Sequence, residues 1–143
     1  MKEFKDLTLK QKQDLLKFPA YISLLASSDA VMDETERLVA INLAHTKAFS
    51  CQPLLEDYCK ESEIIFEENL KQLEASLPKD KESRDVAIRK EMAILEKTLA
   101  RLGKEYVSAM HHSLKSFKEH VLKAHHSVII DFLIPIPVPG LTD

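Results

Sequence analysis

Four acidic residues stand close together between positions 29 and 36, at Asp29, Asp33, Glu34 and Glu36. Hard cations such as Ca²⁺ and Mg²⁺ need several oxygen ligands that converge on one point, and a turn entering a helix supplies carboxylates and carbonyls at short range. The pattern therefore predicts a divalent-cation site formed by Asp29, Asp33 and Glu36. It would not be an EF-hand, because Ala40 stands where that loop requires its bidentate glutamate.

The same residues also have a structural interpretation. Asp33 followed by Glu36 forms a capping box, in which each side chain accepts a hydrogen bond from the backbone of the other residue. Glu34 and Glu36 also oppose the positive end of the helix dipole, and each such role stabilises by about 1 kcal/mol. Capping does not explain Asp29, so the metal and the structural interpretations both stay open.

The stretch from Leu24 to Val39 resembles the tellurite-resistance TerB-like family. In that family a helix of small residues ends in an Asp-Gly turn, and a Glu follows seven residues after the Asp; Asp29 and Glu36 occupy these places. Ala30 replaces the usual glycine, and the later half of the chain has no second motif of this kind. The resemblance extends over about 15–124 through the order of helices. It implies a non-enzymatic stress-response or signalling module that binds a divalent cation and docks onto partner proteins.

Histidines are a second candidate for metal chemistry, because five of the six lie in the last helix and its extension. His126 and Asp131 have the spacing seen in hemerythrin-like di-iron bundles, but the supporting HxxxE, HxxxH and Glu-x-x-His patterns are absent. A solvated helix face is the alternative to a His-rich metalloprotein. The sixth histidine, His45, is expected to be half-buried on an apolar stripe. The five clustered residues are His111, His112, His120, His125 and His126.

Motifs for nucleophilic catalysis are absent, since two glycines leave no GxSxG elbow, P-loop or GxGxxG.

Cys51 and Cys59 lack CxxC spacing, and Cys51 is either a thiolate near a helix start or a small half-buried side chain. The net charge is −3, from 20 basic and 23 acidic residues, so it gives no general attraction to nucleic acid. These features favour a protein that binds rather than catalyses.

Helices must position these groups, because apolar residues recur at intervals of three and four. Thr8 with Gln11 is a capping box, Pro19 is suited to a helix start, and Gly103 is suited to the C′ position of a helix. The predicted fold is an all-α single-domain bundle of about five to seven helices. The expected helices are about 8–18, 19–27, 34–49, 53–77, 82–102 and 106–124, and the predicted buried face of 34–49 is Leu38, Ile41, His45 and Phe49.

The end of the chain differs from the helical domain, which is predicted to span 1–127. Residues 128–143 are expected to form an extended apolar tail, because Pro135, Pro137 and Pro139 alternate with Ile136 and Val138 and forbid a helix. The tail is expected to pack on its own domain, on a second copy in a homodimer, or on a protein partner.

Membrane insertion is not expected, because no apolar run reaches roughly 18 residues. Peripheral association stays open. The charged start of the chain, from Met1 to Leu7, does not have the pattern of a signal peptide. A cytoplasmic location is therefore predicted.

Overall fold

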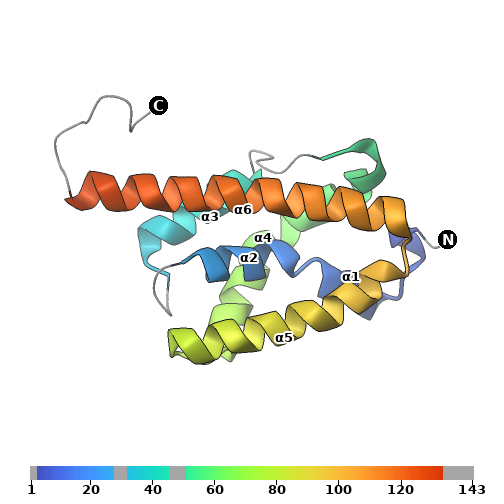
Figure 1. The fold of residues 1–143 in the computed structure, drawn as a ribbon, viewed down its shortest axis with the longest axis horizontal. Helices are drawn as coiled ribbons and strands as arrows, with labels where there is room; N and C mark the ends of the chain where they lie inside the picture. The colour runs from blue at the N-terminus through green and yellow to red at the C-terminus, as the bar shows by residue number, and fades with distance from the viewer. Residues whose placement is uncertain (1–2, 28–31, 46–50, 134–143) are drawn as a thin grey trace.

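The computed structural model describes residues 3–27, 32–45 and 51–133, with side chains as far as residue 124. Within these ranges the chain forms helices and no strand, which confirms the predicted all-α class. No helix in the described part of the chain is long and apolar enough to cross a membrane. The elements are η1 (Phe4–Asp6), α1 (Leu9–Leu15), α2 (Phe18–Ala26), α3 (Glu34–His45), η2 (Pro53–Leu55), α4 (Glu56–Ser76), α5 (Lys81–Ala100) and α6 (Lys104–Leu133) (Figure 1).

Local signals in the sequence determine several helix ends. The Thr8 hydroxyl accepts a hydrogen bond from the backbone N–H of Gln11, and the Gln11 side chain accepts one from the backbone N–H of Thr8, so the predicted capping box is confirmed. Pro19 lies in the first turn of α2, where its missing N–H removes no helical hydrogen bond. Gly103 has φ 92°, and this left-handed conformation ends α5 and lets α6 begin at once.

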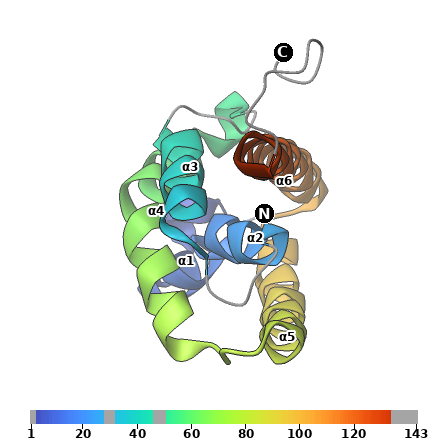
Figure 2. The same ribbon diagram turned by 90° about the vertical axis from the view of Figure 1, so that its left-hand side faces the viewer.

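Helix α2 is the centre of the bundle. It contacts α4, α5 and α6, and the end-on view shows it enclosed by these neighbours (Figure 2). All residues from Phe18 to Leu24 are buried. A short helix that is apolar on every side is stable only when neighbours cover it, so the longer amphipathic helices depend on α2 as their common partner.

Side chains from α4 satisfy carbonyl groups at the end of α1. The hydroxyl of Tyr58 donates to the carbonyl of Leu15 over 2.7 Å, and the Asn69 amide donates to the carbonyl of Leu16 over 3.3 Å. The last carbonyls of a helix have no partner inside the helix. These two buried bonds therefore hold the junction between α1 and α2 against α4.

Side chains at the start of α5 likewise donate hydrogen bonds to carbonyl groups at the C-terminal end of α2. Arg84 is only 1% exposed, and its guanidinium donates to the carbonyl of Leu24 over 2.6 Å. Lys81 donates to the carbonyl of Ser27 over 3.1 Å. Asp85 bonds both cations, at 2.8 Å from Lys81 and 3.2 Å from Arg84. Burial raises the pKa of Asp85, but these bonds and charges outweigh it, so that pKa lies below its ordinary value.

The predicted buried face of α3 is wrong. Leu38 is 57% exposed, and the helix instead buries Glu36, Ala40 and Ala44. Ile41 is only partly buried, and Phe49 lies outside the described residues. Helix α3 packs against both α4 and α6. Two alanines at the contact allow this close approach, which a face of larger side chains would prevent.

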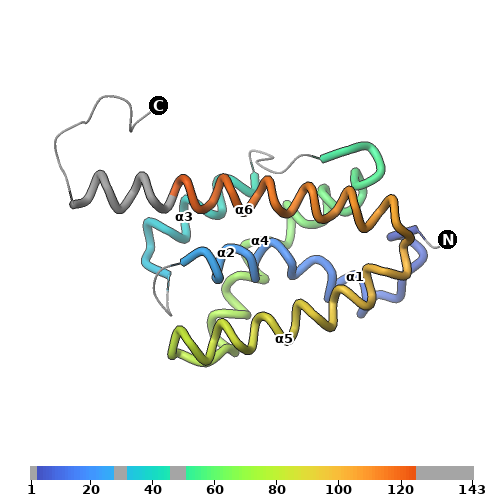
Figure 3. Tube along the Cα trace, in the orientation of Figure 1, coloured from blue at the N-terminus to red at the C-terminus, as the bar shows by residue number. Residues whose placement is uncertain are grey.

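Helix α6 is longer than the sequence predicted. The part of α6 up to residue 124 passes along both α2 and α3 (Figure 3). The helix continues to Leu133, so residues 128–133 of the predicted tail are helical. The prolines of the tail lie outside the described residues. The predicted packing of the tail on its own domain, on a second copy or on a partner therefore stays a prediction.

Candidate functional site

The acidic residues at the start of α3 form the capping box that the sequence predicted. The Asp33 carboxylate accepts from the backbone N–H of Glu36 over 2.7 Å, and the Glu36 carboxylate accepts from the backbone N–H of Asp33 over 3.4 Å. Glu34 pairs with Arg37 at 2.8 Å. The structure thus brings Asp33 and Glu36 together as caps.

The predicted cation site also needs Asp29, which lies outside the described residues. In the described part of the chain, no three His, Cys, Asp or Glu side chains come close enough to hold a metal ion. A metal site at this turn therefore stays a prediction that depends on Asp29.

Three histidines have separate local partners. His45 is exposed, with its Nδ1 at 3.6 Å from Glu63, so the expectation of a half-buried core histidine is wrong. His111 lies 2.8 Å from Glu96. His120 lies 2.7 Å from the carbonyl oxygen of Ser116. The side chains of the two histidines at 125 and 126 lie outside the described ones.

Cys51 and Cys59 form a disulfide. Both interpretations of Cys51 from the sequence are therefore wrong, because this residue is exposed and its sulfur is bonded. The bridge joins residues separated by 8 positions, and it ties the segment before η2 to the first turn of α4. It closes a short loop that contains η2.

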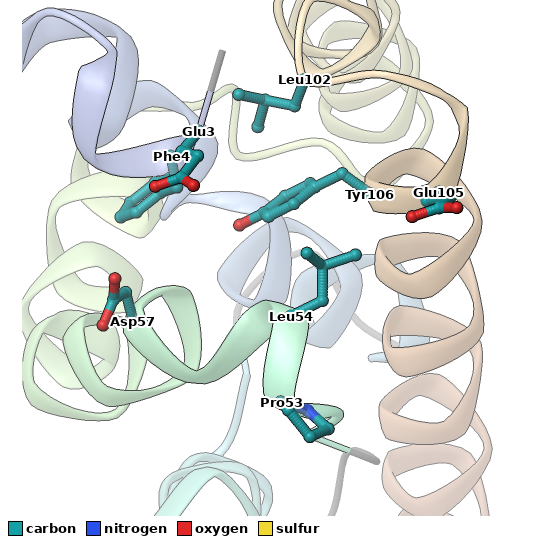
Figure 4. Close-up of a pocket in the computed structure, with 8 residues that line it drawn as sticks. All are labelled: Glu3, Phe4, Pro53, Leu54, Asp57, Leu102, Glu105 and Tyr106. Atoms are coloured by element: carbon teal, nitrogen blue, oxygen red, sulfur yellow. The ribbon is translucent and has the colours of Figure 1, made fainter. Parts of the chain in front are cut away.

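A cavity of about 390 Å³ lies where η1, η2 and the start of α6 meet (Figure 4). This size is within the usual range for small-molecule sites. Segments far apart in the sequence form its walls, so it exists only in the folded protein. Its lining residues are Glu3, Phe4, Pro53, Leu54, Asp57, Leu102, Glu105 and Tyr106.

Tyr106 supplies the polar group of the cavity that is most deeply buried. Its side chain enters between Phe4 and Leu54, with the hydroxyl directed toward the side on which Asp57 lies (Figure 4). The residue is 5% exposed, and its hydroxyl has no hydrogen-bond partner among residues 3–27, 32–45 and 51–133. Burial, and then the charges of Asp57 and Glu61, raise the pKa of Tyr106, so the phenol is neutral at physiological pH.

Glu3, Asp57 and Glu105 supply three carboxylates to the lining, and no basic side chain is among the described residues that line the cavity. Glu3 and Asp57 lie on the side toward which the hydroxyl points, and Glu105 lies on the other side of Tyr106 (Figure 4). Glu3 precedes η1 and is paired with Lys5 at 3.1 Å. Asp57 and Glu105 lie in the first turns of α4 and α6, where they also oppose the helix dipoles. The cavity therefore has a negative rim.

The cavity also has apolar walls (Figure 4). Leu54, Leu102 and the rings of Phe4 and Pro53 supply this surface. Phe4 is held in place by an edge-to-face contact with Tyr58, with ring centroids 5.5 Å apart. The disulfide limits movement of the η2 wall. The cavity combines a rigid apolar surface with convergent polar groups, as ligand sites do.

The sequence did not indicate this cavity. Tyr106 is the first residue of the expected helix over 106–124, and its ring is buried as an apolar residue of such a helix would be, but the sequence pattern says nothing about its hydroxyl. Asp57 and Glu105 resemble ordinary acidic residues of first helical turns. Only the assembly of residues 3–4, 53–57 and 102–106 reveals the site.

No protein-family model, curated protein or solved structure matches this chain. The resemblance to the TerB-like family therefore stays a prediction. The function has to be argued from the chemistry of the site.

Proposed function

We propose that this protein is a non-enzymatic binding module whose ligand site is the cavity beside Tyr106. The observation that carries the proposal is the buried Tyr106 hydroxyl, which faces the cavity and has no partner within the described residues. Most buried polar groups in folded proteins are hydrogen-bonded, and leaving one without a partner costs about 1–3 kcal/mol. A ligand with a complementary polar group would recover that free energy on binding.

The cavity favours binding over catalysis. Its deepest polar group is a phenol whose pKa is raised, so it is a weaker proton donor than an ordinary tyrosine. Its carboxylates belong to exposed residues at the rim. An activated nucleophile requires a base within hydrogen-bond reach. The described lining residues contain no histidine, cysteine, serine or lysine that would form such a pair.

A screen of small molecules by two-dimensional ¹⁵N–¹H NMR tests the proposal. We expect hits to shift the backbone amides of Leu54, Asp57 and Tyr106 together. Leu54 is half exposed at the cavity, so Leu54→Trp fills the entrance without disturbing the core and should abolish these shifts. Hits that persist in the filled variant, or a diverse screen without hits at this cavity, would refute the proposal.

A second candidate is the divalent-cation module that the TerB-like resemblance suggests. Its support is the placement of Asp33 and Glu36 beside each other at the start of α3, directly after the segment that contains Asp29. A cation that binds only the folded state raises the midpoint of thermal unfolding. Chelator-treated protein should be stabilised by millimolar Ca²⁺ or Mg²⁺, and Asp29→Asn should remove the effect. No stabilisation by either ion would reject this candidate.

A further inference from the structure

We infer that the ligand of the Tyr106 cavity is a small organic amine, bound as a primary ammonium ion with an apolar body. The inference rests on the proposed function, because it names the chemical class that the same cavity takes. Three properties of the cavity lead to it: the sign of its charge, the hydrogen-bonding capacity of the buried hydroxyl, and the size of its apolar surface.

The charge of the cavity selects a cation. Glu3, Asp57 and Glu105 all line it, and no basic side chain does so in the described part of the chain. Lys5 offsets Glu3 at 3.1 Å and also acts on Asp57 over a longer distance. Within the described residues, neither Asp57 nor Glu105 forms an ion pair shorter than 4 Å. The starts of α4 and α6 would by themselves favour an anion. Asp57 and Glu105 already place negative charge at these helix starts, so the cavity favours a cation instead.

Among cations, the Tyr106 hydroxyl favours one that carries N–H groups. The phenol is neutral, so its oxygen has lone pairs that accept a hydrogen bond. A primary ammonium has three donors, which are enough for this oxygen and for a carboxylate of the rim. A quaternary ammonium has the same charge but no N–H, and it would leave the buried hydroxyl without a bond. The hydroxyl thus distinguishes a primary amine from other organic cations.

The apolar walls of the cavity select the body of the ligand. Phe4, Leu54 and Leu102 offer an aromatic and aliphatic surface of limited extent, inside a volume of about 390 Å³. An aromatic ring joined to an amine through a short chain matches this combination. Nucleotides and other phosphate compounds are excluded by the negative rim, since like charges repel more strongly in partly buried sites than in water.

Isothermal titration calorimetry with four probes of similar shape tests the inference. The probes are 2-phenylethylammonium, the neutral 2-phenylethanol, the anionic 3-phenylpropanoate and the quaternary trimethyl(2-phenylethyl)ammonium. We expect the primary ammonium to bind at least about tenfold more tightly than each of the others. Added salt should weaken its binding and leave that of the alcohol unchanged.

Matched variants locate the binding. Tyr106→Phe and Asp57→Asn should each weaken 2-phenylethylammonium binding about fivefold or more, because each removes one polar partner on the side toward which the hydroxyl points. Glu82→Gln is the control, since Glu82 is also an exposed acid in a first helical turn, at the far end of α5. It should leave the affinity unchanged.

The outcomes separate the two levels of the proposal. If the alcohol or the anion binds the cavity as tightly as the ammonium, the amine inference fails and the binding module stands. If the quaternary ion binds equally well, or Tyr106→Phe changes nothing while Asp57→Asn does, the primary-amine assignment fails. If no probe binds, or if binding is insensitive to both cavity variants, the amine inference fails, and the fragment screen with Leu54→Trp decides on the cavity itself.

Discussion

Tyr58 and Tyr106 are both buried tyrosines of the same core. Within the described part of the chain only the hydroxyl of Tyr58 has a hydrogen-bond partner, the carbonyl of Leu15 at 2.7 Å. Changing each residue to phenylalanine removes the same single oxygen from a similar environment. We therefore expect Tyr58→Phe to destabilise the protein and Tyr106→Phe to leave it unchanged or slightly more stable.

The magnitudes follow from these partners. Loss of the bond to Leu15 costs about 1 kcal/mol, and about 1 kcal/mol more if the buried carbonyl finds no other donor. Removing the Tyr106 hydroxyl breaks no bond to a described residue and ends the desolvation of a polar group, so the free energy of unfolding should stay constant or rise by up to about 1 kcal/mol. The two variants should differ by about 2 kcal/mol, or roughly 6 °C in Tm.

Urea unfolding followed by circular dichroism measures both variants beside the wild type. A change in midpoint at constant slope reports a change in stability alone. The reasoning is refuted if Tyr106→Phe loses as much stability as Tyr58→Phe. That result would mean that the Tyr106 hydroxyl already has a strong partner within the protein, and the cavity would lose its main claim to a ligand.

Four further predictions concern the rest of the bundle. Arg84→Met should destabilise by about 3 kcal/mol in urea unfolding, because it leaves the buried carbonyl of Leu24 without this donor and removes one of the two cations that Asp85 bonds. The pKa of Asp85 is lowered in the folded state despite burial, so the charged carboxylate stabilises the fold fully above its ordinary pKa of 3.8. This stability is lost as the pH falls through the folded-state pKa, and Asp85→Asn should reduce the loss of stability at acidic pH. Burial raises the pKa of all three tyrosines, so the absorbance of tyrosinate should not rise at pH 10 while the protein is folded. A rise in tyrosinate absorbance at pH 10 in the folded protein would contradict the burial. Replacing Cys51 and Cys59 by alanine should cost roughly 2.5 kcal/mol and weaken ligand binding at the η2 wall, whereas unchanged binding would show that the bridge does not shape the cavity.

Local chemistry made several helix ends predictable from the sequence. The capping boxes at Thr8 and Asp33 depend on residues three positions apart, and Gly103 ends a helix through its own backbone freedom. Such signals need no knowledge of distant parts of the chain, so they were recognised correctly.

Features that depend on tertiary contacts were harder to predict. A hydrophobicity pattern favours large side chains, and it selected Leu38 for the core of α3, whereas close packing against two helices selected Ala40 and Ala44. The disulfide also depends on the fold, because spacing alone does not show that Cys51 reaches Cys59.

The two candidate sites show the same difference between local signals and tertiary contacts. The acidic turn was visible in the sequence because its carboxylates are neighbours along the chain. The Tyr106 cavity was not, since its walls come from three separate segments and its main signal is a missing hydrogen bond. A missing partner can be recognised only after all possible partners have been placed in space.

A crystal structure of the protein with 2-phenylethylammonium tests the central claim most directly. We predict electron density for the ligand inside the cavity, with its nitrogen within hydrogen-bond distance of the Tyr106 hydroxyl oxygen and its ring against Phe4 and Leu102. A cavity filled by the protein's own side chains, with the Tyr106 hydroxyl bonded to one of them, would contradict the claim.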